Sequence, residues 1–125
     1  MDDSAEPRFP LTAATRAGTL VMHAGGALDF EQAPRFQREI EAALATPRLS
    51  TLIIEVSQVS FWDSSGLSGL LVAFQQARTA GIHLILAGVD INLRRRLTIT
   101  GLVHLFDIRP TLAHALQYPD SSPTA

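Results

Sequence analysis

Hydrophobic and polar positions in this chain follow two patterns, short unbroken apolar runs and longer stretches in which apolar residues recur every three or four positions. Unbroken runs of about four to eight residues are typical of buried strands, whereas the wider spacing is typical of helices that pack by one face. Residues 52–56 and 82–87 show the first pattern and are predicted to be strands. Leu20-Val21-Met22 is a shorter run, and the sequence predicts that this strand ends in a turn at Gly25-Gly26.

The second pattern predicts helices between these strands. An early helix is expected to begin at Asp29, whose carboxylate can cap free backbone amides, and to stop before Pro47. The clearest helix follows Trp62 and ends near Gly81. Its apolar face consists of Leu67, Leu70, Leu71, Phe74 and Ala77.

The last part of the chain continues the alternation. Asp90 or Asn92 can cap a third helix, and a short strand is expected within residues 103–108. Thr111 is the predicted cap of a last helix over residues 112–118.

Alternation of strands and helices from Gly18 onward implies crossover connections and a sheet with helices packed on it. Residues 8–14 are the expected hairpin partner of the first long strand. The sequence therefore predicts a single α/β domain. Its four- to five-stranded sheet is expected to be mixed but largely parallel, with an N-terminal hairpin and about four covering helices.

Length and composition agree with one folded domain. The chain has 125 residues, of which 46% are hydrophobic and 18% are charged, so it has enough apolar material for one packed core. Residues 1–7 are acidic and polar, and residues 119–125 are rich in Pro and Ser. Both ends are predicted to be disordered tails, which leaves a domain over residues 8–118.

Charge and cysteine content narrow the classes of function. The formal net charge is −2 and the isoelectric point is near 6.0, so no basic field favours binding to nucleic acid. Cysteine is absent, which excludes disulfides and thiol catalysis. The acidic N-terminus lacks the features of a signal peptide, and no apolar run reaches the roughly 18 residues of a membrane span. We therefore expect a cytoplasmic protein.

The segment Asp63-Ser64-Ser65-Gly66 carries the most distinctive chemistry, because it lies where a buried strand passes into an amphipathic helix. The first turn of a helix has unpaired amides and the positive end of the helix dipole, so a hydroxyl there is well placed to carry a phosphate. The simpler interpretation is that these residues only cap the helix, since Asp and Ser are the preferred residues at that position.

A resemblance to a known family distinguishes these interpretations. The stretch from Gly18 to Leu116 resembles the STAS domain of anti-sigma factor antagonists in the order of its elements. The Asp-Ser-Ser-Gly-Leu turn at residues 63–67 and the element Gly26-Ala27-Leu28-Asp29 both match motifs of that family.

This resemblance implies a partner-switching function. The unmodified antagonist would bind a GHKL-type serine kinase that acts as an anti-sigma factor, and would thereby free a sigma factor. The kinase would phosphorylate Ser64, with Ser65 as the second choice, and a PP2C-type phosphatase would restore the binding form. Charge added at Ser64 would crowd Asp63 and Asp29 and block the contact without unfolding the domain. The expected partner-binding residues are Asp29, Trp62, Asp63, Ser64, Ser65, Gly66 and Leu67.

Two side-chain assignments stay open at this stage. Trp62 can be a core residue or an exposed anchor for the partner. The cluster Arg94-Arg95-Arg96 can be a solvated helix face or a charged patch that steers an acidic partner.

Enzymatic alternatives find little support. A serine hydrolase requires glycine two residues before its nucleophile, but Trp62 precedes Ser64 at that position. The four histidines show no paired spacing for a metal, and no phosphate-binding glycine motif follows a strand. We therefore expect neither catalysis nor a cofactor. The open alternative is a non-enzymatic STAS binding module of a lipid-transport or stress-sensing assembly.

Overall fold

The computed structural model describes residues 11–117, which form an α/β domain. The strands are β1 (Leu11–Arg16), β2 (Thr19–Leu28), β3 (Thr51–Trp62), β4 (His83–Ala87) and β5 (Asp107–Arg109). The helices are α1 (Ala33–Leu44), α2 (Ser64–Thr79), α3 (Ile91–Ile99) and α4 (Leu112–Gln117), with a short 3₁₀ helix, η2 (Leu102–His104). Within this range no helix is both long enough and apolar enough to span a bilayer.

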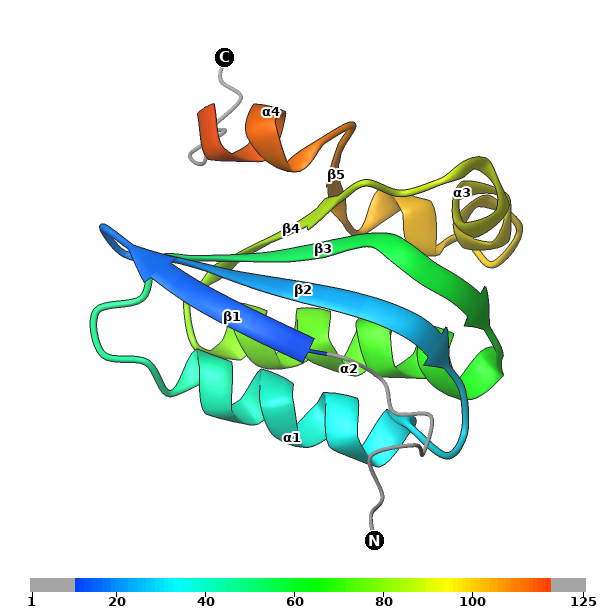
Figure 1. The fold of residues 1–125 in the computed structure, drawn as a ribbon, viewed down its shortest axis with the longest axis horizontal. Helices are drawn as coiled ribbons and strands as arrows, with labels where there is room; N and C mark the ends of the chain where they lie inside the picture. Colours follow the sequence, from blue (N-terminus) through cyan, green and yellow to red (C-terminus); the bar gives the residue numbers. More distant parts are fainter. Residues whose placement is uncertain (1–10, 118–125) are drawn as a thin grey trace, which may run out of the picture.

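The sheet has five strands in the order β1-β2-β3-β4-β5 (Figure 1). Among the strands of residues 11–117, only β1 and β2 are antiparallel, and every other neighbouring pair is parallel. The predicted mixed sheet with an N-terminal hairpin is therefore confirmed. The hairpin strand begins at Leu11 and extends to Arg16, two residues beyond the predicted end. Residues 8–10 of that prediction, like both predicted tails, lie outside the described residues.

Helices cover both faces of the sheet. On one face α1 and α2 pack side by side (Figure 1), and their fully buried residues Phe36, Ile40 and Leu70 belong to the main core. On the opposite face α4 places Ala115 against a smaller cluster that includes Ile53. Burying a large aliphatic or aromatic side chain stabilises the folded state by about 1.5–3 kcal/mol. The two clusters therefore hold the helices against the sheet and keep the ends of its strands in place.

The helix α2 agrees closely with its prediction. It runs from Ser64 to Thr79, and the predicted face is buried at Leu67, Leu70 and Ala77. Gly81 follows the helix with φ +74°, a left-handed conformation that glycine adopts without strain. The main helix predicted from the sequence is therefore confirmed at both ends.

The beginning of α1 differs from its prediction. The helix starts at Ala33, and Asp29 instead closes a separate turn before it. The Asp29 side chain accepts hydrogen bonds from the N–H groups of Glu31 and Gln32, both at 3.1 Å. An aspartate that bonds amides two and three residues ahead stabilises a turn as readily as a helix cap, which explains the error.

The predicted turn at Gly25-Gly26 was also wrong, because β2 continues to Leu28. The pairing of β2 with β3 shifts register on either side of this glycine pair, and Gly26 has φ +77°. Such irregularities are β-bulges, which glycine accommodates inside a strand. The strand β3 likewise continues beyond the predicted Val56 to Trp62. The two long strands carry their C-terminal ends to the same edge.

The C-terminal elements follow the prediction with small changes. Asp90 caps α3 through a 2.8 Å hydrogen bond from the Leu93 amide, which decides between Asp90 and Asn92. The expected short strand is β5, and η2 precedes it. Thr111 Oγ1 accepts a hydrogen bond from the His114 amide at 3.0 Å, as predicted for a cap of α4. Tyr118 lies outside the described residues.

Candidate functional site

The carboxylate of Asp63 connects the ends of two strands. Asp63 is the N-cap of α2, and its Oδ1 accepts a hydrogen bond from the Gly66 amide at 3.0 Å. Its other oxygen, Oδ2, accepts a hydrogen bond from the Phe30 amide at 2.9 Å. Phe30 belongs to the turn that follows β2. One side chain therefore caps the helix and also fixes the neighbouring turn.

These amides also change the acidity of Asp63. Partial desolvation raises the pKa of the carboxyl, but backbone N–H groups at Gly66, Phe30 and Ser65 outweigh that effect. The net result is a pKa below the ordinary value for aspartate, because hydrogen bonds to the charged form stabilise it. Asp63 is thus ionised at neutral pH, and the turn already carries one negative charge.

Gly66 is required by a close approach between α2 and β2. A Cβ atom at this position would collide with the carbonyl oxygen of Leu28 and lie 3.2 Å from its carbonyl carbon. The Asp63 amide also donates to the Leu28 carbonyl at 3.4 Å. The first turn of α2 is therefore held directly against the end of β2, and only glycine fits there.

Ser64 and Ser65 occupy the first two positions of α2. Ser64 is exposed and Ser65 is half-buried. A hydroxyl at the start of a helix lies beside unpaired amides, where a phosphate is tolerated electrostatically. Exposure makes Ser64 the more accessible hydroxyl of the two.

The structure brings Asp29 close to the same turn. Its neighbour in sequence, Phe30, donates its amide to the Asp63 carboxylate, so this hydrogen bond holds the turn that contains Asp29 against Asp63. Asp29 is half-buried and accepts two backbone amides of its own turn. The sequence predicted Asp29 as a neighbour of Ser64, and this stays a prediction.

The predicted site residues Trp62 and Leu67 belong to the interior. Trp62 is 7% exposed and Leu67 is 9% exposed, and both are members of the main core. The structure thus decides in favour of Trp62 as a core residue. Its side chain is buried and therefore does not form an exposed rim.

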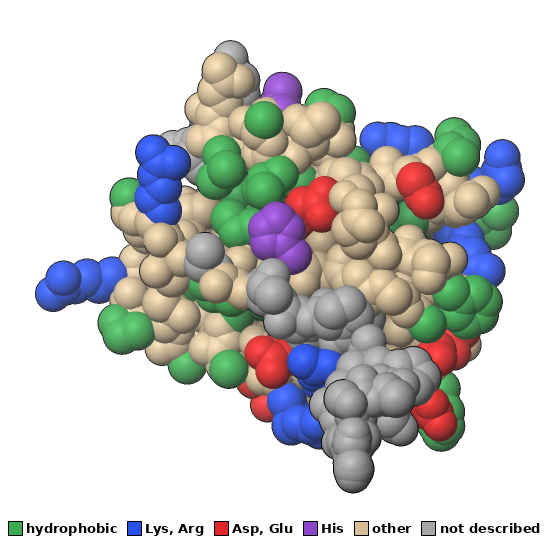
Figure 2. Space-filling model, viewed as in Figure 1, with side chains coloured by type: hydrophobic (Ala, Val, Ile, Leu, Met, Phe, Trp, Pro, Cys, Tyr) green, Lys and Arg blue, Asp and Glu red, His purple; other side chains and the backbone are tan. Residues whose placement is uncertain are grey.

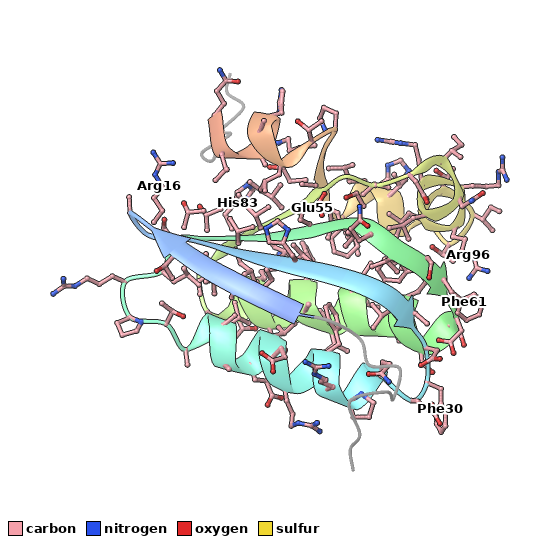
Figure 3. All side chains as sticks on the ribbon, viewed as in Figure 1. Arg16, Phe30, Glu55, Phe61, His83 and Arg96 are labelled. Carbon is pink, nitrogen blue, oxygen red and sulfur yellow. The ribbon has the colours of Figure 1, made fainter. Side chains whose placement is uncertain are left out.

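Two exposed phenylalanines, which the sequence analysis missed, flank the turn instead. Phe30 is 72% exposed and Phe61 is 50% exposed, and both side chains lie at the end of the sheet where β2 and β3 finish (Figure 3). Phe30 directly follows Asp29, and Phe61 directly precedes Trp62 beyond the predicted end of its strand at Val56. Neither residue belonged to the apolar face of a predicted element, and that was the available signal.

The arginine cluster lies on α3 next to this end of β3. Arg94, Arg95 and Arg96 are all exposed, and basic side chains gather over this part of the surface (Figure 2). Arg96 Nη1 donates a 2.8 Å hydrogen bond to the backbone carbonyl of Trp62. The third residue of the cluster therefore contacts the strand that leads into the site, and it is more than a solvated side chain.

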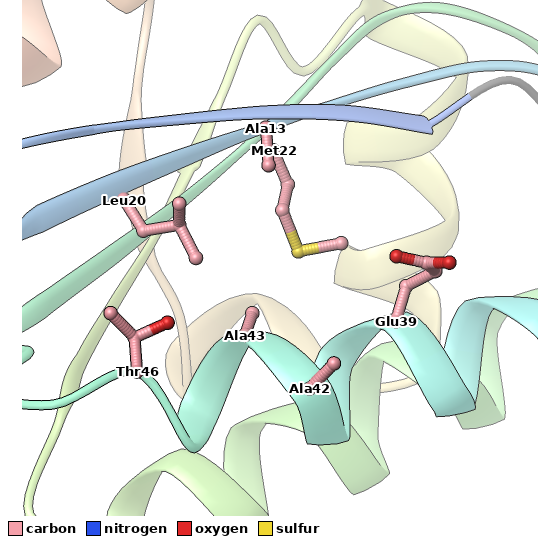
Figure 4. A pocket seen from close by; sticks show the side chains of 7 residues that line it. All are labelled: Ala13, Leu20, Met22, Glu39, Ala42, Ala43 and Thr46. Carbon is pink, nitrogen blue, oxygen red and sulfur yellow. The ribbon is translucent and has the colours of Figure 1, made fainter.

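Another hollow lies away from this turn, between α1 and the hairpin (Figure 4). It has a volume of about 240 Å³ and contains none of the predicted site residues. Its lining is Ala13, Leu20, Met22, Glu39, Ala42, Ala43 and Thr46. Over residues 11–117 there is also no group of three side chains suited to hold a metal ion.

Comparison with known proteins agrees with this fold. A model of the STAS domain matches residues 10–115. The anti-sigma-B factor antagonist of Listeria monocytogenes is 31% identical over 84 residues, which are 67% of this chain and 73% of that protein.

Two solved structures share the fold. An anti-sigma factor antagonist from Mycobacterium paratuberculosis has a TM-score of 0.74 at 29% identity, over 91% of this chain and 96% of that one. The Bacillus cell fate determinant SpoIIAA in its phosphorylated form has a TM-score of 0.69 at 23% identity, over 89% and 98% of the two chains. With the family model spanning nearly every described residue, the chain belongs to the STAS domain family.

Proposed function

We propose that this protein is an anti-sigma factor antagonist that works by partner switching and has no catalytic activity of its own. In its unphosphorylated form it binds an anti-sigma factor that is a GHKL-type serine kinase, and the sigma factor is released. Phosphorylation of Ser64 ends this binding, and a PP2C-type phosphatase restores it. The protein acts in the cytoplasm, where these partners work.

The observation that carries the proposal is the position of Ser64. It is exposed at the first position of α2, directly after the ionised cap Asp63. The Listeria relative is an anti-sigma-B factor antagonist, and SpoIIAA, which has the same fold, occurs in a phosphorylated form. An exposed serine at a helix start, in a chain related to such proteins, supports the switch.

Electrostatics explain why a phosphate would end binding. A phosphoserine adds about −1.5 to −2 charges at neutral pH. At Ser64 that charge would lie beside Asp63 and close to Asp29. The exposed Phe30 and Phe61 flank the same turn, so a partner that covers them would have to desolvate the phosphate. Like-charge crowding together with desolvation weakens an interface by several kcal/mol in order of magnitude.

The direct experiment is to incubate the protein with ATP and the GHKL-type serine kinases of its own genome, and to locate phosphate by mass spectrometry. Ser64→Ala and Ser65→Ala are the matched variants. We expect the label at Ser64, and we expect it to vanish in Ser64→Ala but persist in Ser65→Ala. A label outside these two serines, or no label with any such kinase, would contradict the switch.

The second candidate is a passive STAS module that binds within a lipid-transport or stress-sensing assembly. Such a module has no need for an accessible hydroxyl at the start of α2. The exposure of Ser64 therefore favours the switch. Genes beside the coding sequence distinguish the two, because a serine kinase or sigma factor supports the switch and a permease supports the module.

A further inference from the structure

The second half of β3 has an open edge. β4 pairs only with Thr51–Glu55, the first five residues of the strand. Gly88 lies against Ser57, whose amide donates to Glu55 Oε1. From Gln58 to Trp62 the strand pairs with β2 on one side, and no strand of the described residues lies on the other. An open edge presents backbone N–H and C=O groups that another extended chain can pair with.

A groove runs along this edge, between β3 and α3. It has a volume of about 290 Å³. Ser60, Phe61 and Trp62 line it from the strand, and Asn92, Arg95 and Arg96 line it from the helix. Phe61 and Arg96 lie at the same end of the molecule (Figure 3). The groove therefore presents three kinds of group: the backbone edge of β3, the half-exposed ring of Phe61, and the guanidinium groups of Arg95 and Arg96.

The charge of the groove is positive. Arg95 and Arg96 are exposed, and the one acidic residue in the lining is Asp90. Its Oδ1 accepts the Leu93 amide and caps α3. Two cations against one carboxylate leave a net charge of +1 at the groove, although the whole chain carries −2. A ligand with a carboxylate complements this surface.

Arg96 shows how such a ligand would be held. Its Nη1 donates to the Trp62 carbonyl at 2.8 Å, which is a backbone acceptor that a neighbouring strand would otherwise use. The guanidinium lies against the strand edge itself and presents its remaining N–H donors nearby. A chain extended along β3 would therefore bring its side chains within reach of this arginine.

We propose that this groove binds an extended, acidic segment of a protein partner. The segment adds to the open edge of β3 by backbone hydrogen bonds, and its Asp or Glu side chains pair with Arg95 and Arg96. Strand addition with side-chain pockets is a general mode of peptide recognition. The groove adjoins the turn at Ser64, but this inference does not depend on phosphorylation of that serine.

The test uses a phage-displayed library of random peptides, selected on the immobilised full-length protein. The groove variant is Arg95→Glu with Arg96→Glu. The matched control is Arg38→Glu with Arg78→Glu, which makes the same charge change at exposed residues of α1 and α2. Circular dichroism and thermal melting verify that both variants fold.

Enriched peptides are expected to contain Asp or Glu and to bind the groove variant at least about tenfold more weakly than wild type, with the control close to wild type. In the complex the backbone amides of β3 beyond Ser57 should exchange more slowly with solvent. Any of three results would overturn the inference. These are no enrichment of acidic peptides, an equal loss of peptide affinity in the groove variant and the control, and unchanged amide exchange along this half of β3. Because the library contains no kinase, these outcomes are separate from the outcome of the phosphorylation experiment.

Discussion

Asp63 and Phe30 are 33 residues apart in the sequence, and a hydrogen bond of 2.9 Å joins the Asp63 carboxylate to the Phe30 amide. The same carboxylate caps α2 through Gly66. Loss of its charge therefore loosens both the start of α2 and the turn that carries Phe30. The motif aspartate has a structural role in this protein besides its proximity to the serine.

The first prediction concerns Asp63→Asn. Asparagine keeps the shape but removes the charge, so the variant should be less stable than wild type at pH 7. The folded-state pKa of Asp63 lies below its unfolded value, so its stabilisation is fully present above the unfolded pKa. It is lost as the pH falls through the lower, folded-state pKa.

Urea unfolding of both proteins between pH 7 and acid conditions tests this sign. The difference in unfolding free energy should be constant near neutral pH and shrink in the acid range. A difference that stays constant down to the acid limit would show that the charge of Asp63 does not matter.

The second prediction concerns Gly66→Ala. Alanine favours helices over glycine, but its methyl group would collide with the Leu28 carbonyl. Overpacking against backbone costs about 1–3 kcal/mol, which exceeds the gain in helix propensity of roughly 1 kcal/mol. Ser68→Ala is the control, since Ser68 is exposed on the same helix. Urea denaturation should show a loss of stability for Gly66→Ala only, and equal stability of the two variants would refute the close approach.

Sequence patterns predicted the fold well where one local signal dominated. The apolar face of α2 and the cap of α3 depend on residues within a few positions of each other. The face was predicted correctly at Leu67, Leu70 and Ala77, and the cap was narrowed to Asp90 or Asn92. The continuation of β2 through Gly25-Gly26 depends on pairing with a strand about thirty residues away, so the local turn signal was misleading. Long-range pairing is not encoded in a short window.

The same distinction applies to the site. Asp63, Ser64 and Gly66 form a local motif, and the sequence predicted them as site residues through the family resemblance that this motif carries. The bond from Phe30 to Asp63 and the contact of Arg96 with Trp62 join residues more than thirty positions apart. Burial of Trp62 also follows from packing of the whole core, and so the sequence left it undecided.

The third prediction concerns Arg96→Gln, which shortens the side chain and removes the charge at the Trp62 carbonyl. A hydrogen bond from a charged donor contributes about 1.5–3 kcal/mol when buried and less when partly exposed. We therefore expect a loss of about 1 kcal/mol at most, together with faster amide exchange in α3. Arg95→Gln is the control, because the recorded contact with the strand is made by Arg96. Identical exchange in the two variants would show that the contact does not hold α3.

The fourth prediction separates folding from binding at the exposed rings. Phe30→Ala and Phe61→Ala remove side chains that are 72% and 50% exposed, so each should change stability by no more than about 0.5 kcal/mol. If the partner covers this turn, each should weaken binding to the anti-sigma factor by about tenfold or more. Ile99→Ala is a matched control, because Ile99 is 76% exposed at the end of α3. Calorimetric titration of the kinase measures the losses, and losses no larger than that of Ile99→Ala would remove both rings from the interface.

The last prediction addresses how a negative charge at Ser64 acts. Ser64 is exposed at the first position of α2, where the helix dipole favours negative charge, so Ser64→Asp should retain native circular dichroism and melt cooperatively near the wild-type temperature. Binding to the kinase should nevertheless fall, because the new carboxylate lies beside Asp63 at the contact surface. Gln75→Asp, also exposed but about three turns further along the helix, should bind nearly as wild type. If Ser64→Asp unfolds, charge at this position acts by destabilising the domain. If it binds the kinase like wild type, charge at this position does not control the complex.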